Sequence, residues 1–145
     1  MEKKGLASLK ERIKNEPFAN HMGIRLVDVA PGYAMVEARF SEKMKSFHGL
    51  IHGGAIFALI DEAFGAASNS HGTIALALNM SLTFVKPPKN DSLLVAEARE
   101  ESRTNRTATY HIEVIEKDDG GDRKIAICQA LVYRKDKNLP FWNGE

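Results

Sequence analysis

A glycine pair and a carboxylate that follows it at a short spacing are the residues of this chain best suited to chemistry. Gly53 and Gly54 come directly after His52, and Asp61 follows nine residues after that histidine. Backbone N–H groups at a helix start are unpaired and partly positive, so they can polarise a carbonyl oxygen. A carboxylate can activate water or attack a carbonyl carbon itself. These groups are suited to hydrolysis at a carbonyl carbon, although a structural ion pair is an alternative role for Asp61.

This chemistry requires a helix that begins at the glycines. The segment from residue 53 to about residue 70 is apolar on every side of a 3.6-residue period, which predicts a helix in the core. Asp61 and Glu62 in the middle of this run argue against a membrane span. Glu62 points about 100° away from Asp61, and we expect it to be a solvated or paired charge.

The positions of the two groups on one helix impose a constraint. Gly53 and Asp61 would lie roughly 12 Å apart at 1.5 Å per residue, and a carboxylate reaches only a few ångströms from its backbone. Two antiparallel copies of the helix would place Asp61 of one subunit beside Gly53 of the other. The spacing therefore predicts a homodimer with two symmetric, shared sites.

The composition is that of one globular domain. The chain has 145 residues, of which 43% are hydrophobic and 27% are charged, and these are ordinary globular values. A net charge of +1 gives no reason to expect nucleic acid or a membrane as partner. The single cysteine, Cys128, excludes an internal disulfide and a cysteine-based metal site. We expect no metal, no cofactor and no secretion signal, which fits a cytoplasmic protein.

Periodicity and turn residues place six strands around the predicted helix. A short amphipathic helix near the N-terminus should end by Glu16, because Pro17 follows. One long helix with six strands favours the α+β class, with an antiparallel sheet wrapped around the helix. The tail at residues 135–145 packs on a neighbour or is disordered. The strands are predicted at residues 23–29, 33–40, 73–85, 93–101, 107–116 and 125–133.

The segment from His52 to Asn69 resembles the hotdog-fold thioesterases of the phenylacetyl-CoA thioesterase (PaaI-like) family. The shared pattern is His-Gly-Gly, an aspartate nine residues after the histidine, and a helix of small residues that ends in asparagine. The similarity continues to Lys86-Pro87 and covers about residues 15–134. It implies a single hotdog domain over residues 1–145 that hydrolyses an aryl- or medium-chain acyl-CoA, commonly as a dimer of dimers.

The resemblance also implies roles for individual residues near the motif. Asp61 would be the general base or the nucleophile, and the Gly53 and Gly54 amides would polarise the thioester carbonyl. His52 would help to bind the carbonyl or only cap the helix. Members often carry asparagine six residues before the motif histidine, but this chain has Ser46 there, which has a shorter side chain.

Substrate contacts are implied farther from the motif. Coenzyme A phosphates need cationic or N–H donors, for which Lys86 and Arg106 are candidates. Phe57 and Phe64 are candidates for the acyl pocket, although both also suit a plain core. Early in the strand after the helix, Ala77 stands where members often have serine or threonine.

Two other functions remain open at this point. The replacements at Ser46 and Ala77 leave room for a non-catalytic acyl-CoA-binding module. A hotdog-fold hydratase or dehydratase would need a histidine and a carboxylate facing the substrate, and no second catalytic histidine is evident near Asp61. His48 and His71 are expected to be exposed loop residues.

Overall fold

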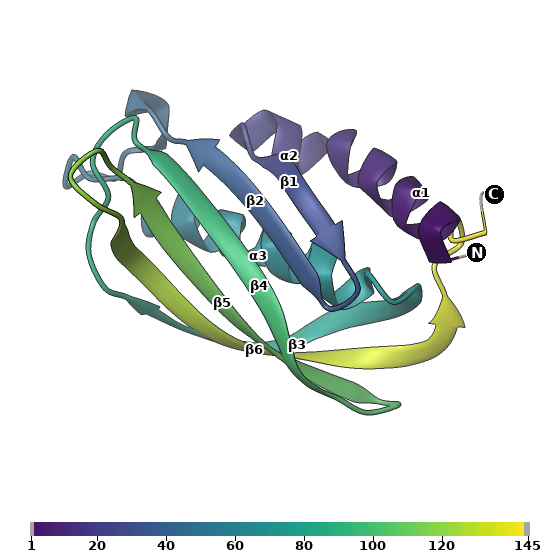
Figure 1. Ribbon diagram of the computed structural model, residues 1–145. Coiled ribbons are helices and arrows are strands. Elements are labelled where there is room, and N and C mark those ends of the chain that lie inside the picture. The colour runs from purple at the N-terminus through teal and green to yellow at the C-terminus, as the bar shows by residue number, and fades with distance from the viewer. Residues whose placement is uncertain (1, 144–145) are drawn as a thin grey trace.

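A six-stranded antiparallel sheet wraps around one long helix in the computed structural model, which describes residues 2–143 (Figure 1). The elements are α1 Glu2–Lys14, α2 Pro17–Met22, β1 Arg25–Ala30, β2 Tyr33–Arg39, the 3-10 helix Glu42–Met44, α3 Gly53–Asn69, β3 Thr73–Phe84, β4 Leu93–Arg103, β5 Thr107–Lys117 and β6 Arg123–Asn138. The sheet order is β1-β2-β4-β5-β6-β3, so β1 and β3 are the edge strands. The predicted α+β architecture is confirmed. The last two residues of the predicted tail lie outside the described residues.

The middle of the sheet holds α3 in place. Ala96 and Ala98 of β4 and Tyr110 and Ile112 of β5 alternate with more exposed neighbours and are fully buried. This is the alternation that the sequence predicts for strands with one face on a core. Because α3 packs on these strands and on β2, the sheet fixes the direction in which the glycine start of α3 points.

The N-terminal region contains a second helix that the sequence did not predict. Pro17 is the first residue of α2, a position that tolerates proline because the helix does not use that N–H. Gly23 ends α2 in the left-handed conformation, with φ 74°, which favours glycine. Pro17 therefore ends α1 and also begins α2, and β1 starts at Arg25 rather than at residue 23.

The C-terminal segment packs on its own chain as far as Trp142, an arrangement that the sequence did not predict. β6 continues to Asn138, beyond its predicted end at residue 133. Trp142 is buried, and a Cβ added at Gly5 or Gly72 would lie 2.3 or 2.5 Å from its ring. The two glycines therefore make room for the indole, and Trp142 fastens α1 to the segment that leads into β3.

One strip of α3 is exposed in the single chain, which corrects the prediction of a helix buried on every side. Phe57 is 40% exposed, and Asp61, one turn later, is also exposed. The neighbouring edge strand β3 exposes Leu76 (48%) and Leu78 (58%). Exposed apolar side chains beside an unpaired strand edge are typical of a face that another chain covers. Across residues 2–143, no helix has the length and apolar character needed to cross a bilayer.

Candidate active site

His52 shapes the start of α3. Its backbone is extended (φ −61°, ψ 135°), and its Nδ1 accepts a hydrogen bond of 2.8 Å from the Gly54 N–H. His52 is therefore the N-cap of α3, which satisfies one of the four N–H groups that a helix start leaves unpaired. This bond would have to break before the Gly54 amide could polarise a carbonyl, so Gly53 is the better donor of the predicted pair.

A cavity of about 360 Å³ opens at this helix start, and we call it the Gly53 cavity. Four of the predicted site residues line it together: Ser46, His52, Gly53 and Lys86. Among the described residues, no acceptor takes a hydrogen bond from the Gly53 N–H. This donor at the positive end of α3 is therefore available for the oxygen atom of a ligand.

Ser46 lies in a short loop along the same cavity. Its N–H donates to the Leu50 carbonyl oxygen at 2.7 Å, and its Oγ accepts a hydrogen bond from the His48 N–H at 3.2 Å. The hydroxyl proton of Ser46 remains available for another acceptor. His48 is exposed, as predicted.

Asp61 lines a different cavity, of about 370 Å³, which we call the Asp61 cavity. Gly53 is absent from its lining, and Asp61 is absent from the lining of the Gly53 cavity. One chain therefore keeps the amide and the carboxylate apart, as the spacing on the helix predicts. Although Asp61 is exposed in the single chain, the cavity walls partly desolvate its carboxyl, and this desolvation, followed by the negative charge of Glu16, raises the pKa of Asp61. A raised pKa makes the ionised carboxylate a better proton acceptor.

Glu62 is half-buried and has no cation partner among residues 2–143, which corrects the prediction of a solvated or paired charge. It lines the Asp61 cavity with Glu16, and its Oε2 is buried with no hydrogen-bond partner among the described residues. Burial, then the closeness of the Glu16 carboxyl and the charges of Glu16 and Asp61, raise the pKa of Glu62 to about 8. No sequence pattern points to Glu16, because it lies far from Asp61 along the chain, between α1 and α2.

Replacing Glu62 with glutamine is expected to stabilise the fold at alkaline pH. The pKa of about 8 in the folded chain lies above the ordinary value of 4.5, so the protonated group favours folding. That contribution is complete below about pH 4.5 and is lost as the pH rises through about 8. Thermal melting should give Glu62→Gln a Tm gain of about 3 °C or more near pH 9 and little gain near pH 5. The same gain at both pH values would contradict a raised pKa.

The two phenylalanines predicted for the acyl pocket lie in different environments. Phe57 is on the exposed strip of α3 and lines neither cavity. Phe64 is 1% exposed, and its ring meets that of Tyr110 edge to face, with centroids 5.7 Å apart. Phe64 is therefore a core residue that also forms part of the wall of the Asp61 cavity.

Lys86 and Arg106, the two cations predicted to hold coenzyme A, lie at opposite ends of the sheet in a single chain. Lys86 follows the end of β3 at Phe84. Arg106 directly precedes β5, which lies near the other end of β3: the first residue of β5 pairs with Tyr133 of β6, and Tyr133 pairs with Leu76 of β3. The stretch of β3 between Leu76 and Phe84 is roughly 26 Å long at 3.3 Å per residue. Arg106 lines a separate polar recess with Arg134 and Lys135. A single chain therefore does not bring the predicted pair of cations together.

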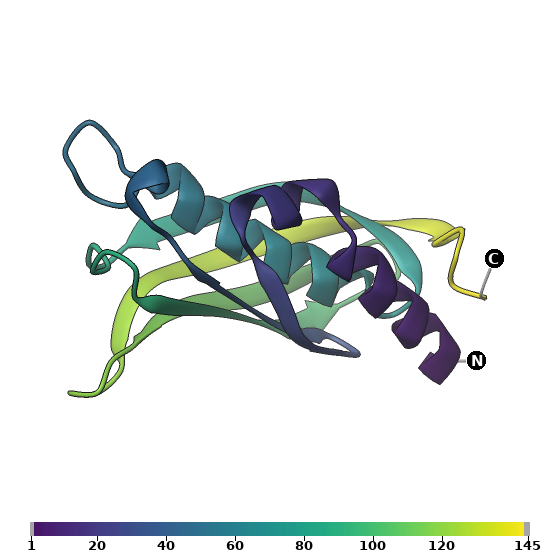
Figure 2. The same ribbon diagram turned by 90° about the horizontal axis from the view of Figure 1, so that it is seen from above.

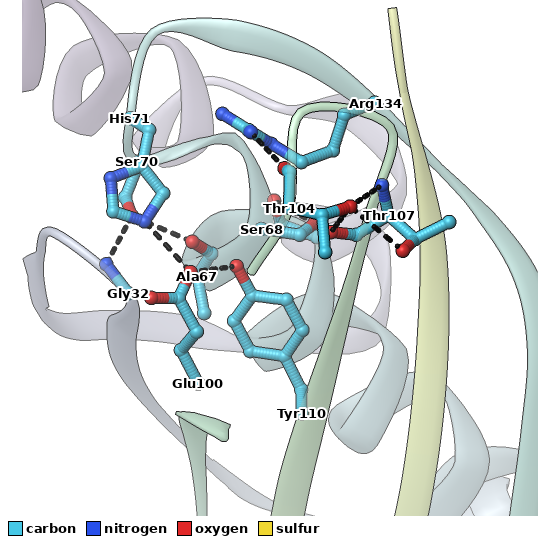
Figure 3. A network of polar contacts seen from close by, with 11 residues as sticks. Gly32, Ala67, Ser68, Ser70, His71, Glu100, Thr104, Thr107, Tyr110 and Arg134 are labelled. Carbon is cyan, nitrogen blue, oxygen red and sulfur yellow. Dashed lines mark hydrogen bonds and ion pairs between the residues drawn. The ribbon is translucent and has the colours of Figure 1, made fainter. Parts of the chain in front are cut away.

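His71 is not an exposed loop residue, which corrects that prediction. Its Nε2 lies 2.8 Å from Glu100 Oε1, to which the Tyr110 hydroxyl also donates at 3.0 Å (Figure 3). Beside it, the Ser70 hydroxyl donates to the Ala67 carbonyl at 2.6 Å and accepts from the Gly32 N–H at 2.7 Å. This network ties the end of α3 to the sheet. It joins residues distant in sequence, so no local pattern could have indicated it.

A family model and two curated relatives point to one family. The model of the Thioesterase superfamily matches residues 48–122, just over half of the chain. A putative esterase of Archaeoglobus fulgidus is 36% identical over 92% of this chain and 88% of its own. The acyl-coenzyme A thioesterase PaaI of Escherichia coli is 29% identical over 83% of this chain and 84% of its own.

The solved structure of the E. coli PaaI protein has the same fold. It matches with a TM-score of 0.86 at 26% identity, over 94% of this chain and 96% of that one. The sheet wrapped around one helix and the sequence matches thus agree on the predicted fold and on the predicted chemistry. The chain belongs to the thioesterase superfamily, as a PaaI-like thioester hydrolase with the hotdog fold.

Proposed function

We propose that the chain hydrolyses the thioester of an aryl- or medium-chain acyl-CoA, which gives coenzyme A and a carboxylic acid. The name of the E. coli relative, acyl-coenzyme A thioesterase PaaI, supports coenzyme A as the carrier. The observation that carries the proposal concerns α3, which presents the Gly53 N–H and the Asp61 carboxylate to two separate cavities. Both groups suit thioester hydrolysis, and two antiparallel copies of α3 can apply them to one carbonyl.

In such a shared site each group has one task. The Gly53 N–H of one subunit donates to the thioester oxygen, while the Asp61 carboxylate of the other takes a proton from water. The water oxygen bonds to the carbonyl carbon, the C–S bond then breaks, and the thiolate of coenzyme A takes the proton from Asp61. Direct attack by Asp61 on the carbonyl is the other route, and it also needs the ionised carboxylate.

The exposed edge of β3 supports an arrangement of two subunits. Its unpaired backbone groups and its exposed leucines, Leu76 and Leu78, suit antiparallel pairing with the same edge of a second copy. That pairing would carry Lys86 of one subunit toward the partner's Arg106, so both cations could hold the phosphates of one coenzyme A. We propose a homodimer of this kind, assembled as a dimer of dimers and working in the cytoplasm.

Release of free thiol from a panel of aryl and aliphatic acyl-CoAs tests the proposed reaction. We expect turnover with at least one aryl or medium-chain substrate, with equal amounts of thiol and carboxylic acid. Sedimentation at the assay concentration should show a dimer or a tetramer. Binding without turnover across the panel would overturn the proposed reaction in favour of a binding module. An active protein that sediments as a monomer would overturn the shared site.

A further inference from the structure

The Asp61 cavity extends along α3 well beyond the group used in the proposed mechanism. Its lining runs from Asp61 to Asn69, a distance of roughly 12 Å along the helix. Cavities of this volume with mainly apolar walls are the usual form of small-molecule sites in proteins. The large apolar side chains that line it come from four parts of the fold: Leu9 and Ile13 of α1, Phe64 of α3, Leu76 of β3 and, after β6, Leu139.

Two of these walls belong to the ends of the chain. α1 and the C-terminal segment lie at the same end of the molecule (Figures 1 and 2). Trp142 holds them together by packing against Gly5 of α1. Both segments lie outside residues 48–122, the part that the superfamily model matches. The part of the cavity wall formed by α1, Glu16 and Leu139 therefore lies outside the segment that defines the superfamily.

Gly65 lies in the interior of α3 and lines the same cavity. Its φ is not in the left-handed region, so the backbone does not require glycine there. A Cβ added at Gly65 would have nothing within 4 Å, so the packing within the chain does not require glycine either. Glycine inside a helix weakens that helix relative to alanine. The absence of a side chain at Gly65 keeps space open beside α3.

We propose that the Asp61 cavity is the chamber for the acyl group of the substrate, with Gly65 setting its capacity. This inference rests on the proposed function, because Asp61 stands at the reacting carbonyl and the acyl group must continue from there. The chamber runs from Asp61 along α3, past Gly65, toward the wall formed by α1 and Leu139. An extended apolar chain or an aryl ring fits a cavity of this length and lining.

The charges along the chamber define what it excludes. Glu16, Asp61 and Glu62 all line it, and within residues 2–143 no lysine, arginine or histidine does. A substrate whose acyl group ends in a carboxylate would bring a fourth acidic group into this cavity without a cation to pair with it, which is costly in a partly buried site. The chamber therefore selects uncharged acyl groups, and butyryl-CoA should be preferred over succinyl-CoA, which has the same chain length.

Enlarging the side chain at position 65 tests the chamber directly. Gly65→Leu should lower the ratio of kcat/KM for octanoyl-CoA to kcat/KM for acetyl-CoA by about tenfold or more, because a poorly fitting methylene in such a pocket has an effect of this size. Gly65→Ala adds only one methyl group and should lower the ratio less. A ratio that does not change in Gly65→Leu would overturn the proposal, and so would an equal loss for both substrates.

Binding of unreactive analogues separates this proposal from the proposed reaction. Thioether analogues of octanoyl-CoA and acetyl-CoA cannot be hydrolysed, and calorimetry measures their binding even if the protein turns over no thioester. Gly65→Leu should weaken binding of the octyl analogue by about tenfold or more and affect the short analogue less. Equal binding of the octyl analogue to both proteins would refute the chamber. If Gly65→Leu sediments as a monomer where the wild type is a dimer, Gly65 serves contact with a second copy, and the proposal is wrong.

Discussion

Asp61→Asn is expected to lower kcat for acyl-CoA hydrolysis by about 10²–10⁴-fold, the usual contribution of a positioned general base. Asparagine has nearly the same shape but can neither accept the proton of water nor attack the carbonyl as a carboxylate does. Because the carbonyl donor at Gly53 is unchanged, the affinity for acyl-CoA should be retained. Thiol release measures kcat. Calorimetry with an unreactive ketone analogue, in which a methylene group separates the sulfur from the carbonyl, measures binding.

Asp28→Asn is the matched control for this experiment. It removes a carboxylate of the same type from β1, where Asp28 is exposed, lies 4.0 Å from Lys10, and lines neither cavity. The control should keep nearly the activity of the wild type. If Asp61→Asn hydrolyses acyl-CoA as fast as Asp28→Asn does, Asp61 is neither the base nor the nucleophile, and the proposed mechanism fails.

Most of the fold could be predicted because the signals act over a few residues. The apolar run at residues 53–70 predicts α3 to within one residue of its observed end at Asn69. Pro31-Gly32 predicts the turn between β1 and β2, where Gly32 has φ 74°. The end of β6 could not be predicted in this way. Its last residues are polar, and the ladder with β3 holds them, since Asn138 pairs with Thr73.

The same distinction applies to the site. Ser46, His52, Gly53 and Lys86 line one cavity, and the first three are close neighbours in the sequence. By contrast, the burial of Glu62 depends on α1 and on the bend after it, which no periodicity places beside α3. The spacing of Gly53 and Asp61 indicates that one copy of the helix cannot bring both the amide and the carboxylate to the same carbonyl group. The sequence does not indicate which surface would contact the second subunit, because the position of β3 at the edge of the sheet depends on the order of the strands.

Gly53→Pro is expected to lower kcat by about 10²–10³-fold, the usual effect of removing one donor to an oxyanion. Gly53 is the first residue of α3, where proline is tolerated. His52 already has the extended backbone that a following proline requires. An added Cβ would meet only the ring of Phe84, at 3.2 Å. Gly53→Ala adds that Cβ but keeps the N–H, so it is the matched control and should retain most of the activity. Equal losses in both variants would point to the contact with Phe84 as the cause.

Mixing the two inactive proteins, Gly53→Pro and Asp61→Asn, tests the shared site. In a hybrid dimer, one site combines Gly53 from the Asp61→Asn subunit with Asp61 from the Gly53→Pro subunit, and this site is intact. The other site carries both defects. Random exchange at equal amounts makes half of the dimers hybrids, so about a quarter of the wild-type activity should return. If each site lay within one chain, no mixture could contain an intact site. Activity that stays at the level of the separate variants, although sedimentation or mass spectrometry shows hybrids, would therefore rule out sharing.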